Sequence, residues 1–178
     1  MGVNWILLSN SEKNSKKVKN IAMCGVLTTL AMIFSYIDSL ILIPIPVPGV
    51  RLGISNIAII TVLYVVGVKE AIFVNILRIA LTSILFGNAT SFWFSITGGM
   101  LSIVVMILLK KIELFSTVGV SVAGGVSHNI GQIIAAVIIM ETDAILYYLP
   151  VLLITGTVAG IVVGIVTAMV LKRLKIHL

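Results

Sequence analysis

The chain has 178 residues, of which 60% are hydrophobic and only 10% are charged. A soluble domain usually carries about 25% charged residues, so this composition excludes a soluble globular protein and predicts apolar side chains that face lipid. The net charge of +6 would suit a nucleic-acid partner, but the basic residues lie at the ends of apolar runs, as in the cytoplasmic loops of membrane proteins. The single cysteine, Cys24, excludes an internal disulfide and a cysteine-based zinc site.

Six segments are long and apolar enough to cross a bilayer core, which needs about 20 residues of helix. They are residues 18–37, 52–67, 69–86, 91–109, 117–140 and 146–171. The second is short, so it either crosses with little tilt or begins inside the preceding loop. We expect an all-α protein, a polytopic membrane protein with a six-transmembrane-helix bundle. This domain would span residues 18–172, between cytoplasmic tails at 1–17 and 173–178.

The basic residues predict the orientation of these helices. If the chain crosses six times, ten of the twelve lysines and arginines fall on the side of both termini. They are Lys13, Lys16, Lys17, Lys19, Lys69, Lys110, Lys111, Lys172, Arg173 and Lys175. The opposite side receives Arg51, with the acidic residues Asp38, Glu141 and Asp143. Because cytoplasmic loops are enriched in basic residues, both termini are predicted to be cytoplasmic.

Prolines alternate with aliphatic residues at 43–49, directly after the first predicted helix. Proline fixes φ and disfavours helix at the residue before it, so this segment is predicted to be extended. It is either a stiff connector or a rigid lid over a cavity.

Small residues recur at helical spacing in two segments. Gly156, Gly160, Gly164 and Ala168 follow a four-residue repeat, which favours close helix packing inside a membrane bundle. A looser stripe on the first helix either packs internally or presents a flat surface to a partner protein. It consists of Ala22, Gly25 and Thr29.

Arg78 lies near the middle of the third apolar segment, on the same helical face as Asn75 and Thr82. A charge at the bilayer centre costs about 2.5–3.5 kcal/mol on insertion scales, and arginine does not lose its proton. No aspartate or glutamate falls inside the apolar core of a predicted segment at that depth, so an anionic ligand is predicted. The alternative is that backbone carbonyls and buried amides satisfy Arg78.

The fifth segment supplies further polar residues at a similar depth. His128 and Gln132 are one turn apart, and Arg78 and His128 are about equally far into their helices. One polar layer at mid-membrane is therefore expected. The residues predicted to bind the ligand are Arg78, Asn75, His128, Asn129, Gln132, Asn56 and Ser95. No metal site is expected, because the only other histidine is His177.

Several catalytic patterns are absent from the sequence. There is no Walker loop for ATP hydrolysis, and no aspartate-rich motif that would hold magnesium and a diphosphate. No Ser-His-Asp or Cys-His set falls at one depth. The chain is therefore not expected to be an enzyme or to hold a cofactor.

A set of short motifs resembles one family of small bacterial membrane proteins. The motifs lie between residues 20 and 172, and they are 48–57 (PGVRLGISNI), 77–79 (LRI), 85–87 (LFG), 95–99 (SITGG), 127–132 (SHNIGQ) and 148–150 (YLP). The family is called the Gx transporter family and also heptaprenyl diphosphate synthase component I. The resemblance implies a multi-pass protein of the bacterial cytoplasmic membrane.

This family is similar to the substrate-binding S components of energy-coupling factor (ECF) transporters. That similarity implies a ligand site facing outward, capped by the loop after the first helix. It also implies docking through Ala22, Gly25 and Thr29 onto a transmembrane coupling protein, with ATP bound by partner ATPases. Its partners would thus be a small polar or anionic molecule, membrane lipid and those proteins. The alternatives are a membrane accessory of isoprenoid or quinone metabolism, including quinone-linked extracellular electron transfer, and a structural scaffold.

Overall fold

The computed structural model describes the backbone of residues 3–40 and 53–176, and the side chains of residues 12–40 and 53–174. Within these residues the protein is helical and contains no strand, which confirms the all-α class. The elements, in chain order, are α1 (Val3–Leu40), α2 (Asn56–Val65), α3 (Val68–Phe86), α4 (Ala89–Ile112), α5 (Thr117–Met140), the short 3₁₀ helix η1 (Asp143–Tyr148) and α6 (Leu149–Ile176). The proline segment 43–49 lies outside the described residues.

The helices identify a multi-pass membrane protein. By length and apolar composition, four described stretches are able to cross a membrane, and they are Glu12–Leu40, Ala89–Ile112, Thr117–Met140 and Asp143–Leu174. Helix α3 has 19 residues and would reach about 29 Å, close to the thickness of the hydrocarbon core, although it carries three charges.

Helix α2 is much shorter than the other long helices. Its 10 residues span about 15 Å, roughly half of the hydrocarbon core. The predicted crossing at 52–67 is therefore only partly helical, and α2 begins at Asn56, well inside the bundle. The count of six spans, which requires this segment to cross, stays a prediction.

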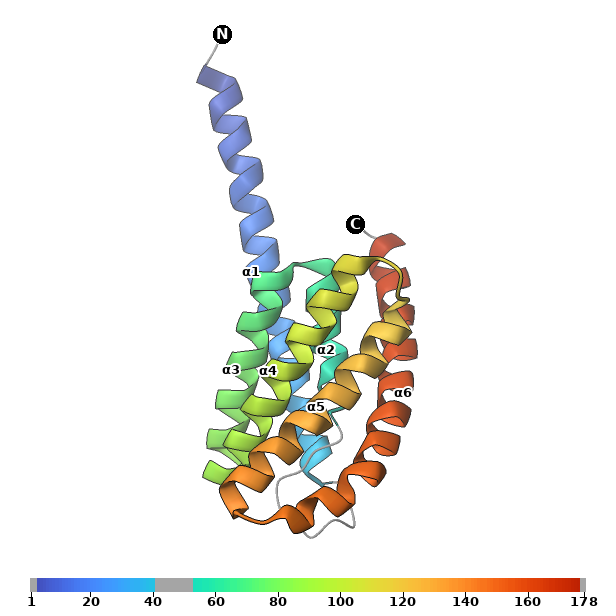
Figure 1. Ribbon diagram of the computed structural model, residues 1–178. Helices are drawn as coiled ribbons and strands as arrows, with labels where there is room; N and C mark the ends of the chain where they lie inside the picture. Colours follow the sequence, from blue (N-terminus) through green and yellow to red (C-terminus); the bar gives the residue numbers. More distant parts are fainter. Residues whose placement is uncertain (1–2, 41–52, 177–178) are drawn as a thin grey trace.

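The helices pack as a bundle in which the start of α1 and the end of α6 lie at the same end (Figure 1). Helix α1 packs on α2 and α3 and projects beyond the others, while α5 packs between α4 and α6. The α2–α3 and α4–α5 connections lie at the end where α6 finishes (Figure 1). We call this the basic end, because Lys69, Lys110, Lys111, Lys172 and Arg173 lie there. Its assignment to the cytoplasm stays a prediction.

The short helix α2 is enclosed by its neighbours. Its side chains from Ala58 to Leu63 are at most 2% exposed. Among them Ile59, Ile60, Val62 and Leu63 form the larger apolar cluster with residues of α1, α3, α4, α5 and α6. A second cluster, around Phe94, Ile133 and Leu152, closes the opposite end between α4, α5 and α6. Asn75, Arg78, His128 and Gln132 are buried as well but belong to neither apolar cluster.

Glycines hold α5 and α6 in close contact. A Cβ atom added at Gly160 would lie 2.6 Å from the Cα of Val122, and one added at Gly164 would lie 2.7 Å from the Cα of Val118. Such separations leave no room for a side chain. The predicted packing of the α6 glycine stripe inside the bundle is therefore confirmed for these positions.

Candidate functional site

Arg78 lies on the buried face of α3 and is only 3% exposed. Its Nε and Nη2 donate to the Oδ1 of Asn75, at 3.2 and 2.9 Å. Its Nη1 donates to the Oγ of Ser35, at 3.2 Å, and to the Oγ of Ser55, at 2.5 Å. The guanidinium thus joins three elements, because Ser35 belongs to α1 and Ser55 immediately precedes α2.

Asp38 brings a carboxylate into the same group of residues. It lies one turn after Ser35 on α1, is 2% exposed, and accepts hydrogen bonds from the N–H groups of Gly53 and Ile54, at 2.8 and 3.0 Å. These residues directly precede Ser55, which binds Arg78. The prediction that no acid lies near Arg78 is therefore wrong. It failed because α1 continues to Leu40 and because the turn before α2 lies inside the bundle.

The start of α2 therefore points into the protein interior rather than into water. A helix N-terminus carries partial positive charge, and here the first N–H groups of α2, those of Asn56, Ile57 and Ala58, donate to carbonyls of the preceding turn. The Ser55 side chain makes no capping bond to α2, because its hydroxyl accepts from Arg78. Broken helices in membrane proteins present such ends to anionic or polar groups near the bilayer midplane. Arg78 and the end of α2 together make this region electropositive, and Asp38 offsets part of that charge.

The turn before α2 also brings α5 close. Gly53 has a φ of +84°, a left-handed conformation that glycine adopts readily. A Cβ there would lie 3.3 Å from Asn56 Nδ2 and 3.6 Å from His128 Cδ2. The turn thus lies against Asn56 and the imidazole of His128, and its positive φ is what favours glycine at this position.

Two glycines of α4 bring α3 and α5 together. The carbonyl of Gly99 accepts a hydrogen bond from Asn75 Nδ2, at 3.0 Å. A Cβ added at Gly98 would lie 2.7 Å from the carbonyl oxygen of His128 and 3.0 Å from Gln132 Cγ. His128 and Gln132 themselves contact each other, with 2.9 Å between their Nε2 atoms.

These contacts form one connected group, which we call the polar layer. It consists of Ser35, Asp38, Ser55, Asn56, Asn75, Arg78, His128 and Gln132. Every member is at most 4% exposed. The structure thus brings together five of the seven predicted ligand residues and adds three others, Ser35 and Asp38 from α1 and Ser55 from the turn before α2. Ser35 and Asp38 are three residues apart, so helical spacing would have paired them if the first predicted helix had extended to Leu40.

Two predicted ligand residues lie elsewhere. Asn129 faces α6, where its Nδ2 donates to the carbonyl of Leu152 at 2.6 Å and lies against Gly156. Ser95 lies on α4, one turn before Gly98 and Gly99, and is 3% exposed. Its hydroxyl has no hydrogen-bond partner in the described part of the protein. Asn129 therefore connects α5 to α6, and the ligand role of both residues stays a prediction.

A narrow crevice adjoins the polar layer between α2, α5 and α6. It is lined by Gly53, Asn56, Ser121 and Gly160, among others. The Ser121 hydroxyl is buried there and has no hydrogen-bond partner among the described residues. Apart from Asn56 and Ser121 the crevice is lined by glycine, alanine and valine, and it has no room for a water molecule. The described residues hold no group of three histidine, cysteine or carboxylate side chains that suits a metal ion.

The predicted docking stripe on α1 lies on the surface. Ala22, Gly25 and Thr29 are exposed, and a Cβ added at Gly25 would have no atom within 4 Å. Gly25 and Thr29 line the outer edge of a groove between α1 and α3. The stripe therefore does not pack inside the bundle, which leaves it accessible to another molecule.

Comparison of the sequence with known proteins assigns the chain to a family. The search of curated proteins returned no match, and neither did the search of solved structures. Residues 27–170 match the family model described as heptaprenyl diphosphate synthase component I. The match runs from the second half of α1 into α6 and includes the whole polar layer. The chain belongs to the heptaprenyl diphosphate synthase component I family, as its sequence motifs predicted.

Proposed function

We propose that this protein is a ligand-binding membrane subunit, similar to the S component of an ECF-type uptake transporter. The observation that carries the proposal is the half-length helix α2, whose N-terminus meets Arg78 in a buried polar layer. Burying polar groups in a bilayer is costly. The guanidinium, amides and hydroxyls of the layer are groups suited to the recognition of a polar molecule.

The chemistry of the layer indicates the class of ligand. Arg78 carries a full positive charge and the start of α2 a partial one, so together they favour a carboxylate, a phosphate or another electron-rich group. Asp38 shows that this position accepts an anion, because its carboxylate binds two backbone N–H groups of the turn. Since Asp38 also offsets the charge of Arg78, a polar or zwitterionic ligand fits as well as an anionic one. His128, Gln132 and Asn56 would hydrogen-bond its remaining groups.

The surroundings of the layer suggest how transport would be organised. In the proposed arrangement six spans place the basic end in the cytoplasm, and the ligand enters from the opposite end. The exposed stripe of Ala22, Gly25 and Thr29 would dock on a coupling protein. ATP would be bound and hydrolysed by ATPases on other chains.

Purification from native membranes tests the proposal. The full chain, carrying an affinity tag, is extracted in mild detergent, and its associated proteins and small molecules are identified by mass spectrometry. The proposal expects a transmembrane coupling protein with ATPases, and one polar small molecule bound per chain. A chain that repeatedly purifies without ATPases and without any bound molecule would contradict it.

A second function is favoured by the family's name and by the apolar groove between α1 and α3. In this alternative the protein is a membrane accessory of isoprenoid or quinone metabolism that associates with another synthase component. The same purification separates the two functions. The accessory role expects a prenyl-synthase subunit and prenyl lipids in place of ATPases.

A further inference from the structure

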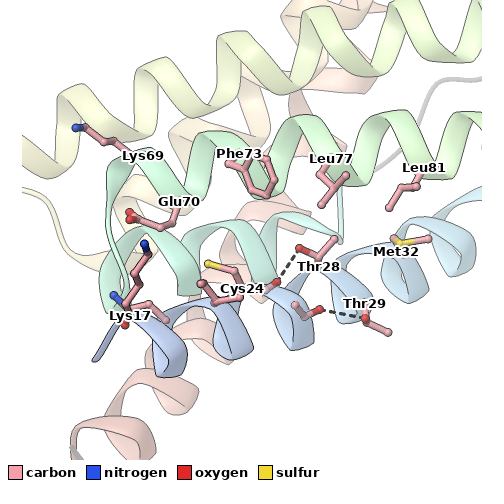
Figure 2. Close-up of a pocket in the computed structure, with 13 residues that line it drawn as sticks. Lys17, Cys24, Thr28, Thr29, Met32, Lys69, Glu70, Phe73, Leu77 and Leu81 are labelled. Carbon is pink, nitrogen blue, oxygen red and sulfur yellow. Dashed lines mark hydrogen bonds between the residues drawn. The ribbon is translucent and has the colours of Figure 1, made fainter. Parts of the chain in front are cut away.

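A groove of about 830 Å³ separates α1 from α3 on the surface of the bundle. Its walls are mainly apolar, with Met32 on α1 and with Phe73, Leu77 and Leu81 on α3 (Figure 2). Gly25 contributes no side chain, which widens the groove at its middle. The groove runs along the outside of α3, since Leu77 lines it while its neighbour Arg78 points into the polar layer.

One end of the groove is charged. Lys17 of α1 and Lys69 of α3 line it there, and Figure 2 shows Glu70 between these two lysines. Within the described residues no ion pair joins these side chains. Lys13, Lys16 and Lys19 lie on the neighbouring turns of α1 and are exposed. Basic residues clustered next to the cytoplasmic end of a transmembrane helix attract anionic lipid headgroups.

The dimensions of the groove suit a lipid chain. The α1 wall runs from Lys17 to Met32, about 22 Å at the helical rise of 1.5 Å per residue. One leaflet contributes about half of a 30 Å hydrocarbon core, or roughly 15 Å. The groove is therefore long enough to take one acyl chain of the leaflet on the basic side, with the headgroup beside the lysines.

We propose that this groove binds one anionic phospholipid, with its phosphate at the basic end near Lys17 and Lys69 and one acyl chain along Gly25, Met32, Leu77 and Leu81. Apolar walls with an unpaired basic end complement an amphiphile that has a negative head. The inference does not depend on the ligand of the polar layer. Because Gly25 and Thr29 also belong to the proposed docking stripe, a partner helix that docks there would displace this lipid.

Native mass spectrometry of the full chain in detergent tests the proposal, with phosphatidylglycerol and phosphatidylcholine of the same acyl chains as probes. We expect the wild type to retain one phosphatidylglycerol per chain in preference to phosphatidylcholine. The double variant Lys17→Gln and Lys69→Gln should weaken this preference by on the order of tenfold. Lys172→Gln, at the same end but outside this groove, is the matched control and should retain the preference.

Filling the groove provides an independent readout. Gly25→Leu and Thr29→Leu both place an apolar side chain at an exposed position. Because a Cβ at Gly25 has no atom within 4 Å, we expect the Gly25→Leu variant to fold. Both variants should lose the retained lipid while unfolding at the temperature of the wild type. Equal retention of the two lipids by the wild type would overturn the proposal. So would lipid retention by folded Gly25→Leu, or a lipid-free dimer that Gly25→Leu separates into monomers.

Discussion

Replacing Asp38 by alanine should destabilise the protein more than any other loss of an acidic side chain in the described structure. The variant removes a carboxylate that is 2% exposed and accepts from the N–H groups of Gly53 and Ile54, at 2.8 and 3.0 Å. A hydrogen bond to a charged group contributes about 1.5–3 kcal/mol. Losing both, with the N–H groups left buried, should lower the free energy of unfolding by roughly 3 kcal/mol or more.

The Asp38→Asn variant distinguishes the contribution of the negative charge to stability from that of side-chain packing. The amide keeps the size of the side chain and one acceptor oxygen, so it should cost less than Asp38→Ala, about 1–2 kcal/mol. Asp143→Ala is the matched control, because this acid is exposed on η1 and should change stability by about 0.5 kcal/mol or less.

Reversible unfolding of the purified chain in mixed micelles, followed by circular dichroism, measures these differences. The expected order of stability is Asp143→Ala, then Asp38→Asn, then Asp38→Ala. If Asp38→Ala were as stable as Asp143→Ala, the turn at Gly53 would not be held by this carboxylate. The reasoning that connects α1 to the start of α2 would then fail.

Two further predictions concern the polar layer. Gly98→Ala should lower the free energy of unfolding by about 1–3 kcal/mol, because the new Cβ would lie 2.7 Å from the His128 carbonyl oxygen. Gly25→Ala, in open space on α1, should instead raise it by about 0.5–1 kcal/mol in the same unfolding assay, because alanine favours helix more than glycine does. Asn75→Ala removes the acceptor of two Arg78 donors, at 3.2 and 2.9 Å, and should cost about 3 kcal/mol. A melting temperature equal to that of the wild type would show that other groups hold the guanidinium.

Much of the architecture follows from apolar length and helical spacing. The apolar runs predict α3 to α6 to within a few residues, because lipid-facing helices need nearly continuous apolar sequence. The three-residue spacing of Asn75 and Arg78 and the four-residue spacing of His128 and Gln132 predict shared faces. The structure shows both pairs in contact.

Other features depend on contacts between segments that are distant in the sequence. The apolar composition of 52–67 suggests a whole span, yet α2 starts at Asn56, because the preceding turn bonds to Asp38 of α1. The sequence predicts that the first helix ends at residue 37, which would place Asp38 in the loop. The structure shows that α1 continues to Leu40 and includes Asp38. Asn129 neighbours His128 in sequence but faces α6, because successive helical residues point in different directions.

The central claim is that the polar layer holds a ligand, and Arg78 tests it most directly. Arg78→Lys keeps the charge and loses the forked geometry, whereas Arg78→Gln removes the charge. Native mass spectrometry compares both variants with wild-type protein and with Lys111→Gln, whose lysine lies at the basic end of α4. We expect the wild type and Lys111→Gln to carry the same small polar molecule, and both Arg78 variants to lose it while staying folded. Folded Arg78 variants that carry that molecule at wild-type occupancy would contradict the claim.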